Sequence, residues 1–594
     1  MNISKKSKVF LIVFIIFFTV FLTFFIIRSS IIVINTSKVD HFTVNSMHDG
    51  TPIHADVYIP SNMEITAPLI IVNHGYTRSS LQNRLLCSFF NKLGYIACSI
   101  DTRGHGFSGG ILSSNISEWT VLGRDIMSVL FHLVDNAAIY KVNTSLIGII
   151  GGSMGGYSST AAGILYPSVF NQTLLGNPFN ISAVVNMAFS GYYLDEFGIS
   201  NETSPPNYMM IMGGNDILFN LPETYVSFKK VANISDTNEE ILRKNYYGNF
   251  ANYDARKLII VPNAGHEIID NYAAAQLVYT KIYAWFSTSF QLNTTNFEDI
   301  TLAPTYFDEF ELSRNLGIII DNVAIVVPFA ALFIILPWVI KKFEKENHFP
   351  KQIDFLNQKN RTFLGLGVMG LLLLAIVLGS LLNPFFTFLN ILGSNFLIPF
   401  FILSIIFLSL FLILLVRNVF PRYNEEFPSD FLGKSNLKVG IATGFIAVSV
   451  FWIVQFILNT IDGIIFIGSI IKVFIFIIYI ALLIPFFFLF NIFIEELIQR
   501  QFLKREIGAL ASIGTGLIVI APGFLIYTLF FYLNRIYIGT GVFAYGDSLL
   551  FIMYAVFFGP IIYYITRNSI ASGIFSAIYL SLWLTSLPMN GILF

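Results

Sequence analysis

The segment GGSMG (residues 151–155) surrounds Ser153 with three glycines directly after an apolar run. This G-x-S-x-G pattern is typical of a tight strand-to-helix turn, where glycines make room for neighbouring backbone and the serine hydroxyl is exposed at the end of the strand. A serine hydroxyl is a weak nucleophile near neutral pH, so it needs a base within hydrogen-bonding reach and a third group that orients this base. The pattern therefore indicates nucleophilic catalysis by Ser153, with two partners elsewhere in the chain.

Two residues that close later apolar runs can supply these partners. Asp216 ends the stretch IMGGND, and His266 ends the stretch VPNAGH. An imidazole can take the hydroxyl proton, and a carboxylate can orient the imidazole, so we predict a catalytic triad of Ser153, His266 and Asp216. Asp195 remains an alternative to Asp216. Four other histidines are less suitable as the base, because three lie before the predicted sheet and one lies in a predicted helix (His41, His48, His54 and His132).

Short apolar runs predict the sheet that positions these residues. Six of them, mostly separated by enough residues for a helix, are 68–75, 94–101, 145–152, 182–190, 208–216 and 257–266. Continuous apolar runs of this length are typical of strands buried on both faces, and hence of a mostly parallel sheet flanked by helices. Two alternating segments, 40–47 and 52–60, predict further strands joined by a turn. Since ligands bind at the carboxyl ends of parallel strands, the predicted triad lies where a site is expected.

Residues from about 39 to 292 resemble the α/β-hydrolase superfamily, in which the order Ser, Asp, His is expected and the serine lies on a nucleophile elbow. The segment HGY (residues 74–76) looks like a loop of this superfamily. The resemblance implies that the backbone N–H groups of Tyr76 and Met154 form an oxyanion hole. A helix that begins after Ser153 would add its dipole and free N–H groups. The predicted class is therefore α/β, with an α/β-hydrolase domain of mostly parallel, helix-flanked sheet.

The segment DTRGHGFSG (residues 101–109) is similar to a second motif of the superfamily, found in esterase and peptidase branches. The resemblance implies that this motif is architectural and that His105 is not the catalytic base. No cluster of cysteine and histidine shows the spacing of metal ligands. We therefore expect neither a cofactor nor a hydrolytic metal.

The composition places a large part of the chain in lipid. The chain has 594 residues, of which 55% are hydrophobic and 12% charged, far from the usual quarter charged. The apolar run 9–27 follows three lysines and is long enough to cross a bilayer, which predicts an uncleaved anchor rather than a signal peptide. Eight further runs are 316–340, 362–382, 396–416, 439–458, 464–494, 511–533, 547–565 and 570–587. We predict an anchor (1–36), the hydrolase domain (37–314) and an all-α, multi-span membrane domain of about eight helices (315–594).

Basic residues predict the orientation, because Lys and Arg collect in cytoplasmic loops. They lie on alternate loops that share a side with the N-terminus: Lys341, Lys342, Lys345, Lys351, Lys359, Arg361, Arg417, Arg422, Lys434, Lys438, Arg500, Lys504, Arg505 and Arg567. The N-terminus is then cytoplasmic and the hydrolase domain extracytoplasmic, in the cell membrane. Eight N-x-S/T sequons agree with a glycoprotein, although abundant Asn and Ser alone would also produce them: Asn35, Asn115, Asn143, Asn171, Asn180, Asn201, Asn233 and Asn293. Cys87 and Cys98 could pair there, or stay as two buried thiols on a helix and a strand.

One polar cluster lies within the apolar C-terminal part. The segment with Glu495, Glu496 and Arg500 resembles the E-E-x-x-x-R motif of CAAX-processing-type intramembrane proteases, and the similarity covers about 439–587. That family needs histidines in the following helices, whereas this chain has none after His348. We therefore expect an i,i+4 ion pair at a helix end or an inactive descendant of the protease fold.

These patterns together predict a membrane-anchored extracytoplasmic serine hydrolase that cleaves an ester, thioester or amide through an acyl-enzyme. The substrate could be a small molecule, a lipid-linked acyl group or a peptide, and membrane lipids are expected partners. No basic patch of the kind that binds nucleic acid is present, and the sequence does not indicate an oligomeric state. Two alternatives are a non-catalytic membrane receptor with a hydrolase-like domain and a degenerate intramembrane protease.

Overall fold

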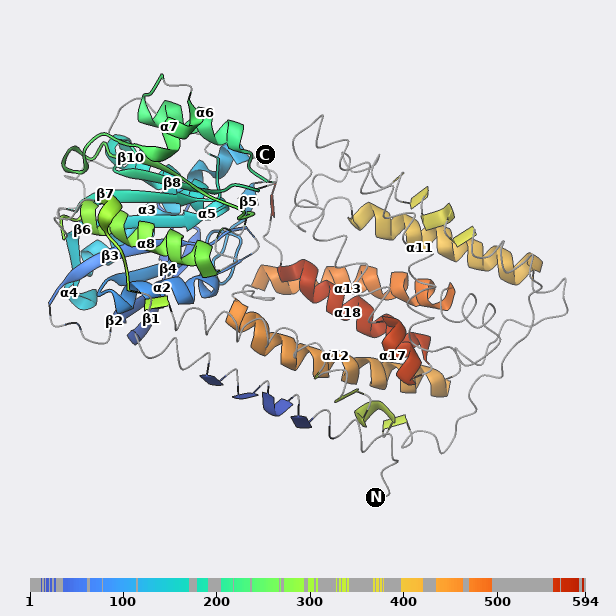
Figure 1. Ribbon diagram of the computed structural model, residues 1–594. Coiled ribbons are helices and arrows are strands. Elements are labelled where there is room, and N and C mark those ends of the chain that lie inside the picture. The colour runs from blue at the N-terminus through green and yellow to red at the C-terminus, as the bar shows by residue number, and fades with distance from the viewer. Residues whose placement is uncertain are drawn as a thin grey trace. The chain divides into compact units, whose positions relative to one another are not determined.

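The computed structural model describes residues 36–303 apart from short gaps, of which the longest are 170–178 and 191–203. In the rest of the chain it describes mainly 397–419, 434–462, 470–493, 559–566, 568–586 and 590–591. The chain forms two compact units (Figure 1). One unit contains Leu22–Asp321 with the short segments Asn459–Ser469 and Pro588–Phe594, and the other contains Met1–Phe21, Asn322–Leu458 and Ile470–Leu587.

The first unit is built on a nine-stranded sheet with the order β1-β2-β4-β3-β6-β7-β8-β10-β9. The strands from β4 to β10 run parallel, and β1, β2 and β9 add antiparallel edges. Their bounds are β1 Thr36–Asn45, β2 Pro52–Pro60, β3 Ala67–Asn73, β4 Ile96–Ile100, β6 Val142–Gly152, β7 Ile181–Met187, β8 Tyr208–Gly213, β9 Tyr246–Tyr247 and β10 Arg256–Val261. A separate pair joins β5 (Leu112–Ser113) and β11 (Asn590–Gly591). The expected mostly parallel sheet is confirmed.

The sequence placed His41 and His54 before the sheet, and this is wrong. His41 lies in β1 and His54 in β2. These two strands form a hairpin, and the hairpin belongs to the sheet because β2 pairs with β4.

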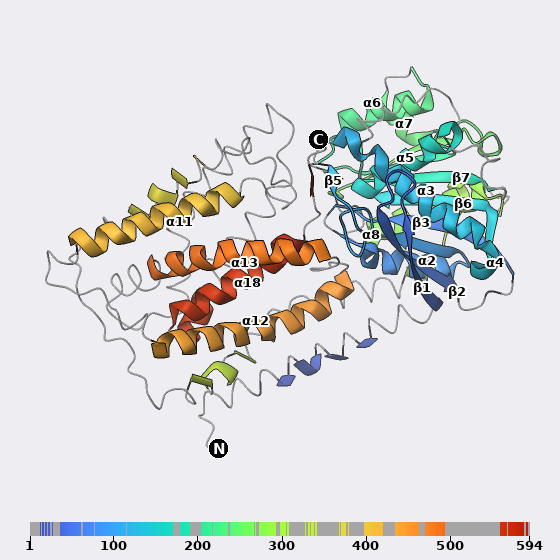
Figure 2. The ribbon, with the colours of Figure 1, turned by 180° about the vertical axis from the view of Figure 1, so that it is seen from behind.

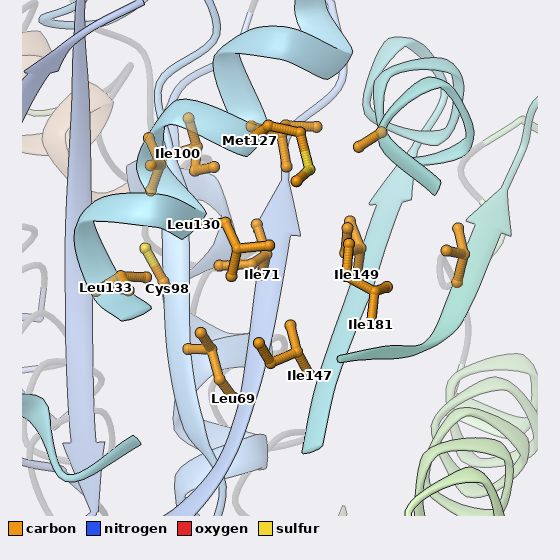
Figure 3. Close-up of a cluster of buried hydrophobic side chains, with 14 of the residues drawn as sticks. Leu69, Ile71, Cys98, Ile100, Met127, Leu130, Leu133, Ile147, Ile149 and Ile181 are labelled. Carbon is orange, nitrogen blue, oxygen red and sulfur yellow. The ribbon is translucent and has the colours of Figure 1, made fainter. Parts of the chain in front are cut away.

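Helices cover both faces of this sheet, because each central strand is apolar on both sides. In β3, Leu69 and Ile71 pack with α3, whereas Ile70 and Val72 pack with α2 and α8. Figure 3 shows Met127, Leu130 and Leu133 of α3 against the first of these faces. The helices are α2 Arg84–Lys92, α3 Thr120–Asp135, α4 Ala137–Tyr140, α5 Met154–Val169, α6 Leu221–Ala232, α7 Glu239–Lys244 and α8 Tyr272–Ser289.

The two cysteines lie in different core clusters. Cys87 on α2 packs on one face of the sheet, and Cys98 on β4 points to the other face. Both are buried and free, which agrees with the interpretation of two separate thiols.

The second unit is a packed group of helices, seen from both sides in Figures 1 and 2. They are α11 Leu397–Leu414, α12 Lys434–Asp462, α13 Ile470–Asn491, α17 Gly559–Thr566 and α18 Ser569–Ser586. Residues 571–582 of α18 are all buried. Gly440 and Gly444 of α12 allow close packing, since an added Cβ would contact Ile570 and Ile574 of α18.

One of the described helices is long and apolar enough to cross a membrane, namely α13 over Val473–Asn491. Shorter apolar helices cover Phe401–Arg417, Leu437–Ile453 and Ser569–Leu582. The count of about eight spans therefore stays a prediction. Glu495, Glu496 and Arg500 lie outside the described residues.

Candidate active site

Ser153 is the single residue between β6 and α5, and its backbone is in the left-handed region with φ of +56°. This conformation costs a residue with a side chain about 1–2 kcal/mol. Glycine is required on both sides, because a Cβ at Gly151 would meet the carbonyl of Gly155 and a Cβ at Gly155 would meet the carbonyl of Asn73. The glycine pattern thus allows a bend that directs the hydroxyl away from the sheet.

His266 and Asp216 come from the loops that follow β10 and β8. Nε2 of His266 lies 2.9 Å from Oγ of Ser153, and Nδ1 lies 2.9 Å from Oδ2 of Asp216. Gly213 at the end of β8 permits this approach, because a Cβ there would meet the carbonyls of Ala264 and Gly265. The structure therefore brings together three side chains that are far apart in the sequence.

The surroundings of Asp216 determine how the imidazole is protonated. Oδ1 of Asp216 accepts hydrogen bonds from the backbone N–H groups of Leu218 (2.8 Å) and Phe219 (3.1 Å). A carboxylate only accepts hydrogen bonds, so Nδ1 of His266 carries the proton and Nε2 presents its lone pair to Ser153. The Asp216 side chain is fully buried, whereas that of His266 is 18% exposed. His266 is thus accessible from solvent, whereas Asp216 is shielded from water.

The loop after β3 is held beside the serine by His74. The backbone N–H of Thr102 donates to Nε2 of His74 at 3.0 Å, so Nδ1 carries the proton and donates to the Gly75 carbonyl at 2.7 Å. The C=O and N–H of a trans peptide point in opposite directions, so the N–H of Tyr76 points away from His74. A Cβ at Gly75 would lie 3.6 Å from Cβ of Ser153. This N–H and those at the start of α5 can therefore bind an oxyanion.

The motif at residues 101–109 fixes this loop from the other side. The Asp101 carboxylate accepts the backbone N–H groups of Ser80 (2.6 Å) and Phe107 (2.9 Å). Burial raises the pKa of Asp101 to about 6, although these two hydrogen bonds act in the opposite direction. Gly106 has φ of +50°, and a Cβ there would clash with the Asp101 carboxylate.

Arg103 and His105 of the same motif are both buried. Arg103 donates to both carboxylate oxygens of Asp125 at 2.7 Å and to Asp49 at 2.8 Å. His105 lies within 3.1 Å of the Arg103 carbonyl. These contacts join the motif to neighbouring segments of the domain, and its architectural role stays a prediction from the resemblance.

A series of aromatic side chains links the loop after β3 with His266. Successive ring centroids lie 5.3–6.3 Å apart along the series Tyr76, Trp119, Tyr157, Phe189, Phe219 and His266. Tyr157 and Phe189 are buried, whereas Tyr76 at one end of the series and Phe219 beside His266 are only partly buried. An aromatic series therefore reaches from the loop after β3 to His266, which contacts Ser153.

The sequence motifs named the residues of the triad and the oxyanion loop, and the structure places them together. The alternative carboxylate Asp195 lies outside the described residues. Sequence reasoning assigned no role to His74 as an anchor, nor to Trp119 and Phe219 in the aromatic series. His74 could have been noticed as the first residue of the HGY segment, whereas nothing in the spacing of the two aromatic residues pointed to Ser153.

Comparison with known proteins agrees with this site. Residues 65–189, which include the HGY, DTRGHG and GGSMG segments, match the family described as serine aminopeptidase, S33. No curated protein matches the sequence. Solved structures that align with the chain include a truncated carbohydrate esterase from gut microbiota (16% identity, TM-score 0.31, 43% of this chain and 98% of that chain). Another is a hyperthermophilic esterase from the archaeon Pyrobaculum calidifontis (14% identity, TM-score 0.31, 48% and 99%). The family match confirms the resemblance inferred from the motifs: over residues 65–189, the N-terminal part of the chain is similar to hydrolases of the α/β-hydrolase fold.

Proposed function

We propose that the chain is a membrane-anchored, extracytoplasmic serine hydrolase that cleaves an ester, thioester or amide through an acyl-enzyme. One observation carries this proposal: His266 lies 2.9 Å from both Ser153 Oγ and Asp216 Oδ2. This is the geometry that general-base activation of a serine requires.

In the proposed mechanism, Ser153 attacks the acyl carbonyl while Nε2 of His266 takes the hydroxyl proton. Asp216 keeps the imidazole oriented and stabilises the positive charge that forms on it. The backbone N–H groups of Tyr76 and Met154 stabilise the oxyanion. His266 then gives the proton to the leaving group, which departs and leaves the acyl group on Ser153. Water attacks this acyl group while His266 takes a proton from the water, and His266 returns the proton to Oγ of Ser153 as the acid is released. No cofactor or metal takes part in these steps.

The aromatic series that reaches His266 favours an apolar substrate. The partly buried ring of Tyr76 lies at one end of the series, and that of Phe219 is 5.6 Å from the His266 ring. Since apolar groups gain free energy when they leave water, we propose that an apolar acyl or alcohol group binds here. Small esters, lipid-linked acyl groups and peptides with apolar side chains all fit this description.

The helical unit supports membrane attachment, because many of its exposed side chains are apolar as well as its buried ones. About half of the surface of each of these side chains is exposed: Ile406, Leu410, Ile413, Phe445, Ile453, Phe474, Ile477 and Ile478. Outward apolar faces on α11, α12 and α13 suit contact with lipid tails and not with water. The basic loops then predict that the hydrolase domain lies outside the cytoplasm.

Active-site labelling of the full chain in native membranes tests the proposal. A fluorophosphonate probe should label the wild type, and Ser153→Ala should abolish the label. Ser145→Ala is the matched control, since Ser145 is exposed on β6 outside the bend and its loss should leave labelling unchanged. Equal labelling of wild type and Ser153→Ala would remove Ser153 from the mechanism. Protease added to intact cells should degrade the hydrolase domain; its protection would overturn the proposed orientation.

A further inference from the structure

Two histidines and one carboxylate meet at the edge of the sheet, away from the predicted triad. β1 and β2 pair so that His41 lies opposite Asp56, and His54 lies two residues before Asp56 in β2. Residues i and i+2 of a strand point to the same side, so all three side chains share one side. Oδ1 of Asp56 lies 2.6 Å from Nδ1 of His41 and 3.1 Å from Nε2 of His54.

We propose that His41, His54 and Asp56 bind one divalent transition-metal ion, with zinc as the best match. Within the described part of the chain, this is the one group of three or more candidate ligand side chains whose ligand atoms all lie within 4.8 Å of one another. Imidazole nitrogen suits zinc, copper, iron and nickel, whereas magnesium and calcium prefer oxygen ligands. Two imidazoles and one carboxylate form a three-ligand zinc set that leaves a fourth position for water.

The geometry needs only a small adjustment to accept the ion. Ligand atoms at about 2.0–2.1 Å from a tetrahedral zinc lie about 3.4 Å apart, so His41 must move away from Asp56 by less than about 1 Å. The His41 side chain is 60% exposed and free to turn, whereas that of Asp56 is 3% exposed and stays in place. The strand pairing fixes the backbone of all three ligands, so little conformational entropy is lost when the ion binds.

Hydrogen bonds from neighbouring side chains orient two of the three proposed ligands. Oγ of Ser80 donates to the second oxygen of Asp56 at 2.8 Å, which leaves Oδ1 for the ion. Oγ of Thr43 lies 3.5 Å from Nδ1 of His54, on the side of the ring away from Asp56. Such contacts orient metal ligands and increase affinity.

The ion would have a structural role, not a hydrolytic one. The cluster is on β1 and β2, whereas the triad follows β6, β8 and β10, and β4 and β3 lie between the two groups in the sheet. β1 is an edge strand that pairs only with β2 in this sheet. A bound ion would join the two strands through their side chains and stabilise the edge of the domain.

Metal binding to the purified full chain in detergent tests the proposal. After chelator treatment and its removal, zinc is added, and the bound metal is measured by elemental analysis and by competition with a chromophoric chelator. We expect about one tightly bound ion per chain, a higher midpoint of thermal unfolding with zinc, and affinity lowered at least about a hundredfold by His41→Ala. His48→Ala is the matched control, because His48 is an exposed histidine that contacts Arg124 and lies outside the cluster.

Three results would overturn the proposal: no stoichiometric zinc on the wild type, equal affinity in wild type and His41→Ala, or equal losses in His41→Ala and His48→Ala. His41 is exposed, so its replacement should leave the fold intact. Unchanged fluorophosphonate labelling of His41→Ala would verify this and keep the metal test separate from the proposed hydrolase activity.

Discussion

Replacement of Asp216 by asparagine should inactivate the enzyme by trapping the wrong form of His266. Two backbone N–H groups, from Leu218 and Phe219, donate to Oδ1 of Asp216. In the variant, the side-chain amide oxygen of the asparagine must accept these two hydrogen bonds. If the amide were turned around, its NH₂ group would face two other donors and no hydrogen bond could form. The NH₂ group is then directed at Nδ1 of His266, which must accept, so the proton moves to Nε2. An Nε2–H group points its proton at Ser153 and cannot act as the base.

The expected loss of kcat follows from the tautomer of His266 that carries its proton on Nε2. The serine loses its base, while the backbone donors of the oxyanion hole and the substrate contacts remain. A loss of this kind lowers kcat by about 10³–10⁴-fold, which corresponds to about 4–5.5 kcal/mol in the activation free energy. KM should change little, because Asp216 is fully buried and does not face the substrate.

The assay is hydrolysis of p-nitrophenyl esters by the full chain, with kcat and KM measured for wild type, Asp216→Asn and Asp216→Ala. The alanine variant is the informative control, since without the amide the imidazole can still adopt the active tautomer. We expect Asp216→Asn to be no more active than Asp216→Ala. If Asp216→Asn keeps more than about a tenth of the wild-type kcat, or clearly exceeds the alanine variant, the tautomer argument is refuted.

Three further outcomes are expected. His74→Phe removes the hydrogen bond to the Gly75 carbonyl and should lower kcat at least about tenfold with little change in KM, in the same ester assay, because one oxyanion donor loses its orientation. Arg103→Met leaves the buried carboxylate of Asp125 without its charged partner, with only the Ser46 hydroxyl donating to it, and should destabilise the domain by about 3–5 kcal/mol, seen as an earlier thermal loss of labelling. Burial raises the pKa of Glu298, but hydrogen bonds from two lysines outweigh this and hold it below its usual value of 4.5. Its stabilisation is therefore complete above about pH 4.5 and is lost as the pH falls through the lowered pKa, so the thermal midpoint of Glu298→Gln should fall less on acidification than that of the wild type.

The parallel strands and the motifs were predictable because their signals are local. A strand buried on both faces reads as one apolar run, as in IMG before Asp216, and a bend that needs glycine shows glycine, as around Ser153. The end of such a strand also marks where side chains gather. The three residues of the triad could therefore be predicted from the ends of the apolar runs and from their order in the chain.

The register between strands could not be predicted in this way. His41 is thirteen residues from His54 and lies next to it only because β1 pairs with β2 in one particular register. A shift by one residue would turn His41 to the opposite side of the sheet. For the same reason, the spacing of cysteines and histidines showed no metal site in the sequence. The arrangement of the helical unit was even harder to predict, since a continuous apolar run does not distinguish a lipid-facing helix from a buried one.

The strained bend at Ser153 is maintained by its neighbours on both sides. The N–H of Ser153 donates to the Met187 carbonyl at 2.7 Å, and the carbonyl of Ser153 accepts the N–H of Tyr157 at 3.0 Å. Each bond contributes about 0.5–1.5 kcal/mol net, which is enough to offset the left-handed conformation at about 1–2 kcal/mol. Glycine at this position would avoid the strain but would lack the hydroxyl, while the flanking glycines carry no chemistry and only provide space. The proposed role of Ser153 as the nucleophile would account for this strain, because it requires a hydroxyl at the one position of the bend where glycine would be unstrained.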